Sequence, residues 1–152
     1  MTDAGADRPG RAVGVDLGAR RIGIAVSDSA GTLAMPRGTL VRTGDRDRDR
    51  RALVDLVIEE GAVVVVVGHP LSLDGTRGPA AMAAEAEAEA LAGLLDDHGI
   101  RVELFDERMT TVSAHQALTA GGTKGRNQRA VVDQTAAAVM LTAWLDGRRG
   151  ER

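Results

Sequence analysis

The segment from Val13 to Asp28, V-G-V-D-L-G-A-R-R-I-G-I-A-V-S-D, constrains the fold more than any other part of the chain. Two runs rich in Val and Ile flank a short stretch of Gly and Arg, which is typical of a β-hairpin. The first strand places Asp16 near its end, beside Gly18. Short Asp-x-Gly sequences are common turn formers, so this acid alone indicates a turn as readily as a functional site. Its role depends on which other carboxylates the fold brings to the same rim.

The residues after this hairpin predict a third strand and a helix. Residues 32–41 form a weaker strand candidate, in which Pro36 requires an edge position or a bulge. A charged loop at 43–51 then passes into a helix whose apolar residues have helical spacing, and Gly61 ends that helix.

The rest of the chain alternates strands with helices. Residues 62–67 are consecutive apolar residues, mostly Val, which predicts a central strand buried on both faces. A helix from about Pro79 to Asp97 is favoured because Ala and Glu are strong helix formers, and a strand at 101–105 follows it. The chain is completed by a short helix from Thr110 or Thr111 to Gly121, a basic loop at 121–127 and a helix at about 128–146.

Three antiparallel strands followed by βαβ crossovers specify an α/β fold with a mixed five-stranded sheet and helices on both faces. We expect one domain at 13–147, between a disordered tail at 1–12 and a flexible tail at 148–152. The chain has no Cys, one Phe, one Trp and no Tyr, so Val, Leu, Ile and Ala must build the core, and Cys-based metal sites are excluded. No apolar run reaches membrane-spanning length, and we expect a cytoplasmic protein without a membrane partner.

The net charge of −3 by itself argues against a nucleic-acid partner. Two basic clusters argue the other way. The cations concerned are Arg42, Arg46, Arg48, Arg50 and Arg51 in the first cluster and Lys124, Arg126 and Arg129 in the second. These clusters are either solvated faces or phosphate-binding patches, because salt-dependent phosphate binding needs only a local excess of positive charge.

Four acids can meet near one edge of the predicted sheet. Asp16 ends the first strand, Asp106 and Glu107 follow the last strand, and Asp133 lies in the second turn of the final helix. Functional groups collect at the carboxyl ends of parallel strands, and an acid on an apolar helix face needs a partner. The pattern therefore favours a metal site. The alternatives are a plain turn at Asp16 and, at the other positions, acids that interact favourably with the dipole at the start of a helix.

Four motifs, in this order, resemble the YqgF/RuvX family of small bacterial nucleases: G-V-D-L-G-A-R-R-I-G-I-A-V-S-D, V-V-G-H-P-L-S-L-D-G-T-R-G-P, D-E-R-M-T-T-V-S-A and V-V-D-Q-T-A-A-A-V-M-L. The resemblance covers about 13–146 and implies a ribonuclease H-like fold. It implies a cytoplasmic nuclease that processes the 5′ end of the 16S rRNA precursor in ribosome biogenesis. The alternative is a Holliday junction resolvase that acts as a homodimer. The family's catalytic and metal-binding acids fall on Asp16, Glu107 and Asp133.

Phosphodiester hydrolysis at such a site is expected to use two Mg²⁺ or Mn²⁺ ions. We expect Asp16 to bridge both ions, Glu107 and Asp133 to hold one each, and Asp106 to support the site or cap a turn. The cations expected to hold flanking phosphates of a structured RNA or branched DNA are Arg20, Arg21, Arg108, Lys124, Arg126 and Arg129. Such contacts position the backbone without reading its sequence.

The sequence departs from the family pattern at His69, Met109 and Thr142, none of which is a candidate ligand, and His69 is expected to be a loop side chain. Two other classes deserve comparison. Actin-like ATPases also begin with a D-x-G hairpin, but they need two such domains and a second Gly-rich phosphate loop. A catalytically silent RNA-binding assembly factor would keep the basic patches without needing all three acids.

Overall fold

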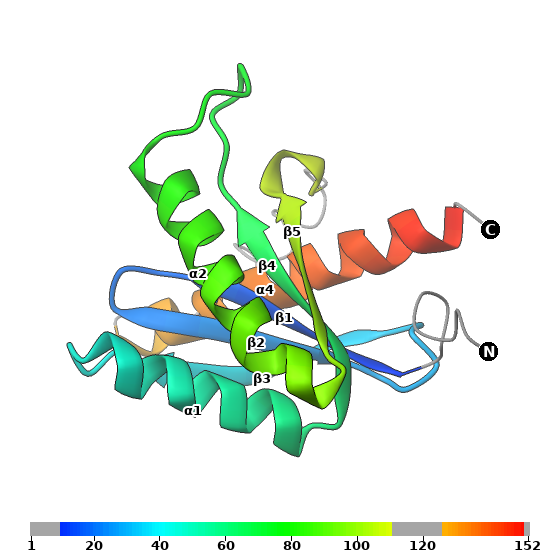
Figure 1. Cartoon of the computed structure of the whole chain (residues 1–152). Helices are drawn as coiled ribbons and strands as arrows, with labels where there is room; N and C mark the ends of the chain where they lie inside the picture. Colours follow the sequence, from blue (N-terminus) through cyan, green and yellow to red (C-terminus); the bar gives the residue numbers. More distant parts are fainter. Residues whose placement is uncertain (1–9, 111–125, 151–152) are drawn as a thin grey trace.

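The fold is built on one five-stranded sheet with the strand order β3-β2-β1-β4-β5 (Figure 1). In this computed structural model the described residues are 10–110 and 126–150, and side chains are described within them except at 126–135 and 149–150. The strands are β1 (Arg11–Leu17), β2 (Arg21–Ser27), β3 (Ala34–Val41), β4 (Ala62–His69) and β5 (Arg101–Asp106). The pairs β1–β2 and β2–β3 are antiparallel, whereas β4 runs parallel to both β1 and β5. The predicted mixed sheet is confirmed.

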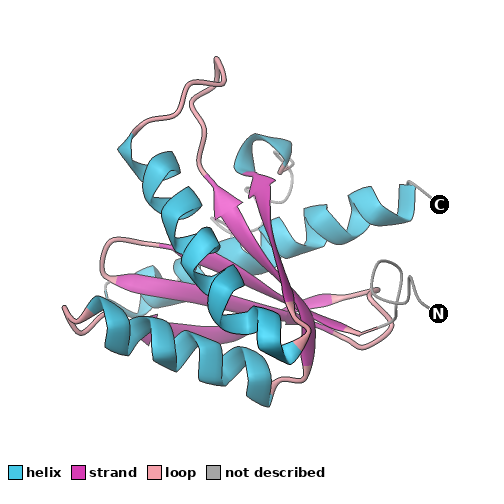
Figure 2. Cartoon of the chain, in the orientation of Figure 1, coloured by secondary structure: helices cyan, strands magenta, loops and turns pink. Residues whose placement is uncertain are grey.

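Helices cover both faces of this sheet, as predicted (Figure 2). The described helices are α1 (Arg46–Glu59), α2 (Pro79–Leu95) and α4 (Arg126–Gly150), with the short 3-10 turns η2 (Asp96–His98) and η3 (Glu107–Met109). The core under α1 and α2 includes Leu53 and Leu91. The core under α4 on the opposite face includes Leu141 and Trp144. None of the described helices combines the length and apolar character that crossing a membrane requires.

Two sequence expectations about strands have different outcomes. Pro36 lies in the edge strand β3, and the β2–β3 register shifts between Ile24 and Ala25, so the expected edge position and bulge are both present. The prediction that His69 lies in a loop is wrong, because β4 continues to His69, which pairs with Asp106 of β5. Gly68 does not end the strand, because β5 pairs with Gly68 and His69 beyond Val67, where the pairing of β4 with β1 stops.

The ends of the predicted elements shift by a few residues. β1 begins at Arg11, and Ala12, which was expected in the tail, is buried in the sheet. α4 begins at Arg126, inside the expected loop, and continues to Gly150. The short helix expected up to Gly121 lies outside the described residues, apart from its expected start at Thr110, which follows η3.

Successive side chains of a strand point to opposite faces, and this alternation decides which residues face which helix. On β1, Val13 and Val15 belong to the core under α1 and α2. Ala12 belongs to the core under α4, and Gly14 lies against Ala137 and Leu141 of that helix. Asp16 lies two residues after Gly14, so it is the next residue of β1 on the side of Ala12 and Gly14. The period of the strand therefore directs Asp16 toward the α4 face.

Candidate active site

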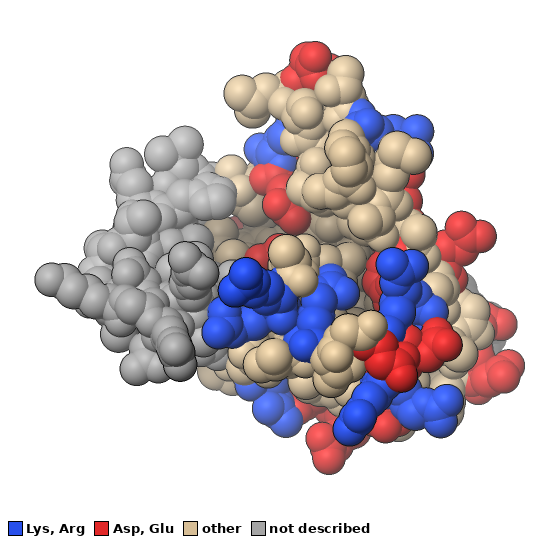
Figure 3. All heavy atoms as spheres, turned by 90° about the vertical axis from the view of Figure 1, so that its left-hand side faces the viewer, with Lys and Arg blue, Asp and Glu red and all other residues tan. Residues whose placement is uncertain are grey.

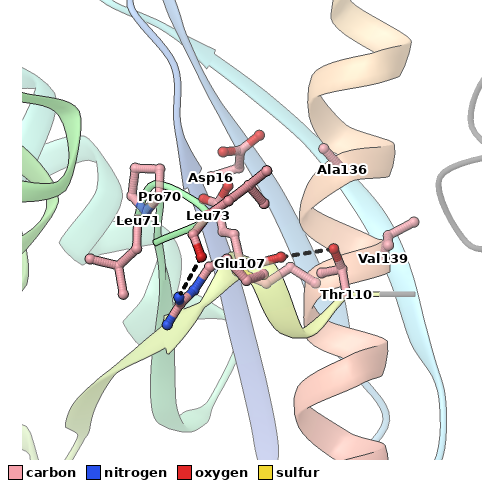
Figure 4. Close-up of a pocket in the computed structure, with 10 residues that line it drawn as sticks. Asp16, Pro70, Leu71, Leu73, Glu107, Thr110, Ala136 and Val139 are labelled. Carbon is pink, nitrogen blue, oxygen red and sulfur yellow. Dashed lines mark hydrogen bonds between the residues drawn. The ribbon is translucent and has the colours of Figure 1, made fainter. Parts of the chain in front are cut away.

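A cavity of about 370 Å³ lies beside the carboxyl ends of β1 and β5, and two carboxylic acids line it. Asp16 comes from the end of β1, and Glu107 comes from the turn that follows β5. Figure 4 shows these two residues on the strand side of the cavity and Ala136 and Val139 on α4. The remaining lining residues are Pro70, Leu71, Leu73, Arg108, Thr110 and Met140. Two acids from distant parts of the sequence thus share one mostly apolar cavity.

The strand order explains why these two acids meet. β4 lies between β1 and β5 and is parallel to both, so the carboxyl ends of all three strands are at the same edge of the sheet. This edge is where α/β proteins commonly place their functional groups. Asp16 and Glu107 lie at the ends of the two outer strands of this parallel set. The acid on η3 must therefore reach across the end of β4 to approach Asp16.

Gly68 near the end of β4 provides the space for this approach. A side chain at position 68 would collide with the carboxylate of Glu107 and would lie 3.1 Å from Sδ of Met140. Position 68 follows Val64 and Val66 in the strand alternation, and both of these belong to the core under α4. The absence of a side chain at Gly68 therefore leaves room for Glu107 between the sheet and α4.

The surroundings of Glu107 disfavour its charged form. Burial raises the pKa of the Glu107 carboxyl above its ordinary value, and the nearby charge of Asp16 raises it further. The charge of Asp106 acts in the same direction, whereas His69 lowers the pKa of Glu107. Because two carboxylates are close together and one is largely removed from water, a bound cation or a proton would relieve their repulsion.

Asp106, the residue before Glu107, has the opposite environment. Its carboxylate caps η3 by accepting a hydrogen bond from the backbone N–H of Arg108 at 2.9 Å, and it pairs with the Arg108 guanidinium at 2.6 Å. The Arg108 side chain lowers the pKa of Asp106. Arg108 also donates a hydrogen bond to the carbonyl oxygen of Leu73 at 3.3 Å (Figure 4). The expected capping role of Asp106 is confirmed, and its pairing fixes Arg108 at the wall of the cavity.

His69 contacts α2 instead of the cavity, a contact that sequence reasoning missed. Its Nε2 lies 2.7 Å from a carboxylate oxygen of Glu85, which also pairs with Arg77. The hydrogen bonds from Arg77 and His69 lower the pKa of Glu85 to about 2. The sequence held one signal for this contact. Glu85 lies at helical spacing from Ala81 and Ala88, both buried, and an acid beside a buried helix face requires a partner.

For the expected site residues at positions 124 to 133 the structure describes the backbone at most. Asp133 lies in α4, as do Arg126 and Arg129, but their side chains are outside the described part, and Lys124 lies outside the described residues altogether. Among the described side chains no three His, Asp or Glu residues form a group that could hold a metal ion. The described acidic part of the site is therefore the pair Asp16 and Glu107.

The two arginines expected near the hairpin turn lie directly after β1. Arg20 is exposed in the turn and lines a second cavity together with Arg42 and Arg46. Arg21 begins β2, where it pairs with Val41 of β3. Positive charge therefore follows Asp16 within a few residues, on the turn that joins β1 to β2.

Comparisons with known sequences agree along nearly the whole chain. The model of a family described as "RuvX: Holliday junction resolvase" matches residues 10–147. A Kineococcus radiotolerans protein named "Putative pre-16S rRNA nuclease" is 46% identical over 142 residues, which cover 93% of this chain and 74% of that protein. A protein of the same name from Mycobacterium sp. (strain KMS) is 45% identical over 150 residues, which cover 94% of this chain and 88% of that protein.

Two solved structures share the architecture at low sequence identity. The T. thermophilus RuvC structure in complex with a Holliday junction substrate has a TM-score of 0.59 and 14% identity, covering 93% of this chain and 96% of that chain. The yeast mitochondrial Holliday junction resolvase Ydc2 has a TM-score of 0.50 and 11% identity, covering 90% of this chain and 78% of that chain. At these identities the likeness concerns the fold alone, and the predicted ribonuclease H-like fold is confirmed.

Proposed function

This chain belongs to the RuvX family of Holliday junction resolvases, as its four motifs predicted, and on that premise we propose that it is a metal-dependent nuclease acting on the 16S rRNA precursor in the cytoplasm. The observation that carries the proposal is the pair Asp16 and Glu107, which line one cavity at the carboxyl ends of parallel strands. We propose RNA as the substrate because relatives that are 45% and 46% identical to this chain are named pre-16S rRNA nucleases.

We further propose that Asp133 supplies a third carboxylate from α4. Position 133 precedes Ala136 by three residues and Met140 by seven, and both of these residues line the cavity. An α-helix repeats every 3.6 residues or so, so positions separated by three or seven residues lie on the same side of the helix. This spacing supports a place for Asp133 on the cavity side of α4, one turn closer to the start of the helix.

The acids of this cavity fit a hard divalent cation. Mg²⁺ and Mn²⁺ are bound by carboxylate oxygens together with water and substrate phosphate oxygens, so a few acids suffice. Burial, and then the charge of Asp16, raise the pKa of Glu107, and a bound cation would offset both effects. When bound, a divalent ion polarises the phosphate and lowers the pKa of a coordinated water molecule. We propose that two ions are held, with Asp16 shared between them and Glu107 and Asp133 each holding one.

The other residues of the cavity position the substrate and limit access of water. The walls formed by Leu71, Val139 and Met140 are apolar, which strengthens electrostatic interactions inside the cavity. Arg108 lies at the same wall, held by Asp106 and by the carbonyl oxygen of Leu73. A guanidinium fixed in this way can hold a phosphate of the substrate backbone without reading a base.

A second candidate function is the resolution of four-way DNA junctions. The family description and the structural likeness to junction resolvases favour it. Symmetrical cutting of a junction requires two active sites, so this activity requires a homodimer. Trimming the end of an RNA does not. Measuring the molar mass in solution beside the cleavage assays distinguishes the two functions.

The test offers purified protein a labelled RNA with an unprocessed 5′ extension and, separately, a four-way DNA junction, each with Mg²⁺ or Mn²⁺. Asp16→Asn is expected to lose at least about 1,000-fold in cleavage rate, or roughly 4 kcal/mol of transition-state stabilisation, while the circular dichroism spectrum stays unchanged. Asp55→Asn removes one negative charge from an exposed position on α1 and serves as the matched control. Full activity of Asp16→Asn would refute the assignment.

A further inference from the structure

A second cavity, of about 490 Å³, lies at the corner where the β1–β2 turn meets the loop between β3 and α1. We call it the arginine groove, because Arg20, Arg42 and Arg46 line it. Arg20 comes from the turn, Arg42 from the residue after β3, and Arg46 from the first residue of α1. Figure 3 looks onto this side of the molecule and shows Lys and Arg side chains gathered in the middle of the face, next to acidic side chains.

The groove is attached directly to the turn that follows β1, the strand that carries Asp16. Arg42 donates a hydrogen bond from Nε to the carbonyl oxygen of Gly18 at 2.7 Å, and its backbone N–H donates to the carbonyl oxygen of Arg20 at 2.9 Å. Gly18 is two residues after Asp16, and its own N–H is bonded to the carbonyl oxygen of Arg21 at 3.0 Å. These bonds fix the guanidinium of Arg42 relative to the end of β1. The groove and the acidic cavity therefore adjoin the same tight turn.

Several arginines of the described part have a carboxylate partner. Arg37, Arg50, Arg77, Arg101 and Arg108 each pair with a carboxylate. None of the salt bridges found between described residues involves the three arginines of the groove. An acid, Asp49, also lines the groove; its carboxylate accepts hydrogen bonds from the hydroxyl and backbone N–H of Thr43, and the nearby charge of Arg42 also lowers its pKa, so one negative charge opposes the three arginines.

Arg46 is also placed against the dipole of its own helix. It is the first residue of α1, where the helix dipole favours negative charge and opposes a cation. The N-cap position is already filled by Asp45, whose side chain accepts a hydrogen bond from the N–H of Arg48. A phosphate bound between Arg46 and Arg42 would offset this unfavourable placement. The groove thus gathers three cations whose mutual repulsion an anion would relieve.

We propose that the arginine groove binds the sugar–phosphate backbone of the nucleic acid strand that continues beyond the cleaved bond, an inference that rests on the proposed nuclease function. The groove adjoins the turn that follows β1, and in this proposal a strand held at the acidic cavity continues along that turn into the groove. No aromatic residue is among the side chains that line it, so bases have no aromatic side chain to stack on there. Contacts of arginine with phosphate alone make the binding independent of base sequence.

The test measures binding without cleavage. Fluorescence anisotropy of a labelled single-stranded RNA and a labelled RNA duplex is recorded in EDTA over a series of NaCl concentrations. The double variant Arg42→Gln with Arg46→Gln is expected to bind of order tenfold more weakly at 0.1 M salt and to reduce the salt slope by about 1.4 for the single strand or 1.8 for a duplex. Arg37→Gln with Arg101→Gln removes the same charge from β3 and β5, away from the groove, and is expected to retain the wild-type slope.

Two further arms make the result specific. Arg42→Lys with Arg46→Lys keeps both charges but gives up the Nε bond to Gly18, and we expect it to retain most of the binding and the slope. Equal losses in the Lys and Gln variants would overturn the proposal, because the effect would then come from the geometry of the turn. Labelled poly-glutamate that binds the intact groove more tightly than either RNA at the same salt concentration would also overturn it, in favour of an acidic protein partner.

The same experiment separates failure of the groove from failure of the nuclease. If the Gln variant keeps the wild-type salt slope, the groove does not bind nucleic acid. The cleavage assay then decides separately whether the protein is a nuclease. A reduced slope together with absence of cleavage by the wild-type protein supports the groove and refutes the nuclease function.

Discussion

The two faces of the sheet are filled with side chains of different size. Under α1 and α2 the strands present mostly Val and Ile, and the helices add Leu91 and Leu95, both fully buried. Under α4 the sheet presents small residues, and a methyl group added at Gly14 would lie 3.1 Å from Cβ of Leu141 and 3.3 Å from the carbonyl oxygen of Ala137. α4 therefore lies much closer to the strands at this point than a layer of leucine side chains would allow.

The two faces consequently have different roles. Each fully buried leucine side chain contributes about 1.5 to 3 kcal/mol to folding. Among the described residues the face with α1 and α2 has Leu53, Leu91 and Leu95 at 0% exposure, whereas the face with α4 has Leu141. The face with α4 uses small residues, which lets Ala136 and Met140 reach the same cavity as Asp16 and Glu107. Substitutions that affect one face but not the other test this division.

The largest expected effect is on activity, from Glu107→Gln on the α4 face. The variant keeps the size of the side chain but removes a proposed metal ligand, so cleavage should fall by at least about 1,000-fold, which is roughly 4 kcal/mol. Single-turnover cleavage of the labelled RNA at saturating metal measures this loss. A fall of less than tenfold would mean that Glu107 contributes only to the shape of the cavity.

The next largest effect is on stability, from Leu91→Ala on the opposite face. Leu91 is fully buried in α2, so the truncation should destabilise the protein by about 2 to 5 kcal/mol. Urea denaturation followed by circular dichroism measures this change. The cleavage rate per folded molecule should stay at the wild-type value, and a loss as large as that of Glu107→Gln would contradict the division between the faces.

Gly14→Ala should affect both stability and activity. The added methyl group cannot fit between β1 and α4 without moving the helix, which should cost about 1 to 3 kcal/mol and displace the residues of α4 that line the cavity. Gly93→Ala is the matched control, because nothing lies within 4 Å of a side chain at this position of α2. That control should stabilise the protein slightly, by up to about 1 kcal/mol, through higher helix propensity.

The fold could be predicted from the sequence because its signals are local and strong. The hairpin, the Val-rich central strand and the Ala-rich helix each have the periodicity or propensity of one element only. Strand alternation even allows Asp16 to be assigned to the same face as Gly14. The contact between His69 and Glu85 was missed because it joins a strand end to a helix face, and no local pattern specifies which residues of two elements will meet.

The candidate site could be predicted only in part. The two acids at the ends of β1 and β5 follow from topology, because parallel strands on either side of β4 must end at one edge. The different environments of Asp106 and Glu107 do not follow from the topology. One carboxylate caps η3 and pairs with Arg108, whereas the other is buried beside Gly68, and this difference depends on three-dimensional packing that the sequence pattern does not contain.

The smallest expected effect concerns stability in the absence of metal, where Glu107 should weaken the α4 face. The pKa of Glu107 is raised in the folded protein by burial and by the charge of Asp16. A carboxyl whose pKa is higher in the folded state stabilises the fold in its protonated form. That contribution is fully present below the pKa of the unfolded chain and is lost as the pH rises through the pKa of the folded state. At neutral pH the ionised Glu107 should therefore make the metal-free protein less stable than its uncharged variant.

Glu107→Gln should accordingly raise the melting temperature in EDTA at pH 7. The difference from wild type should shrink as the pH falls toward 4, because Glu107 then takes up its proton in both states. Adding Mg²⁺ should reverse the order at pH 7, since an ion that binds only the native state stabilises the wild-type protein. Leu91→Ala should show none of this pH dependence relative to wild type, because the face that carries it holds no such charge. An equal stability of wild type and Glu107→Gln at every pH would show that Glu107 is fully solvated in solution, and α4 would then not lie against it.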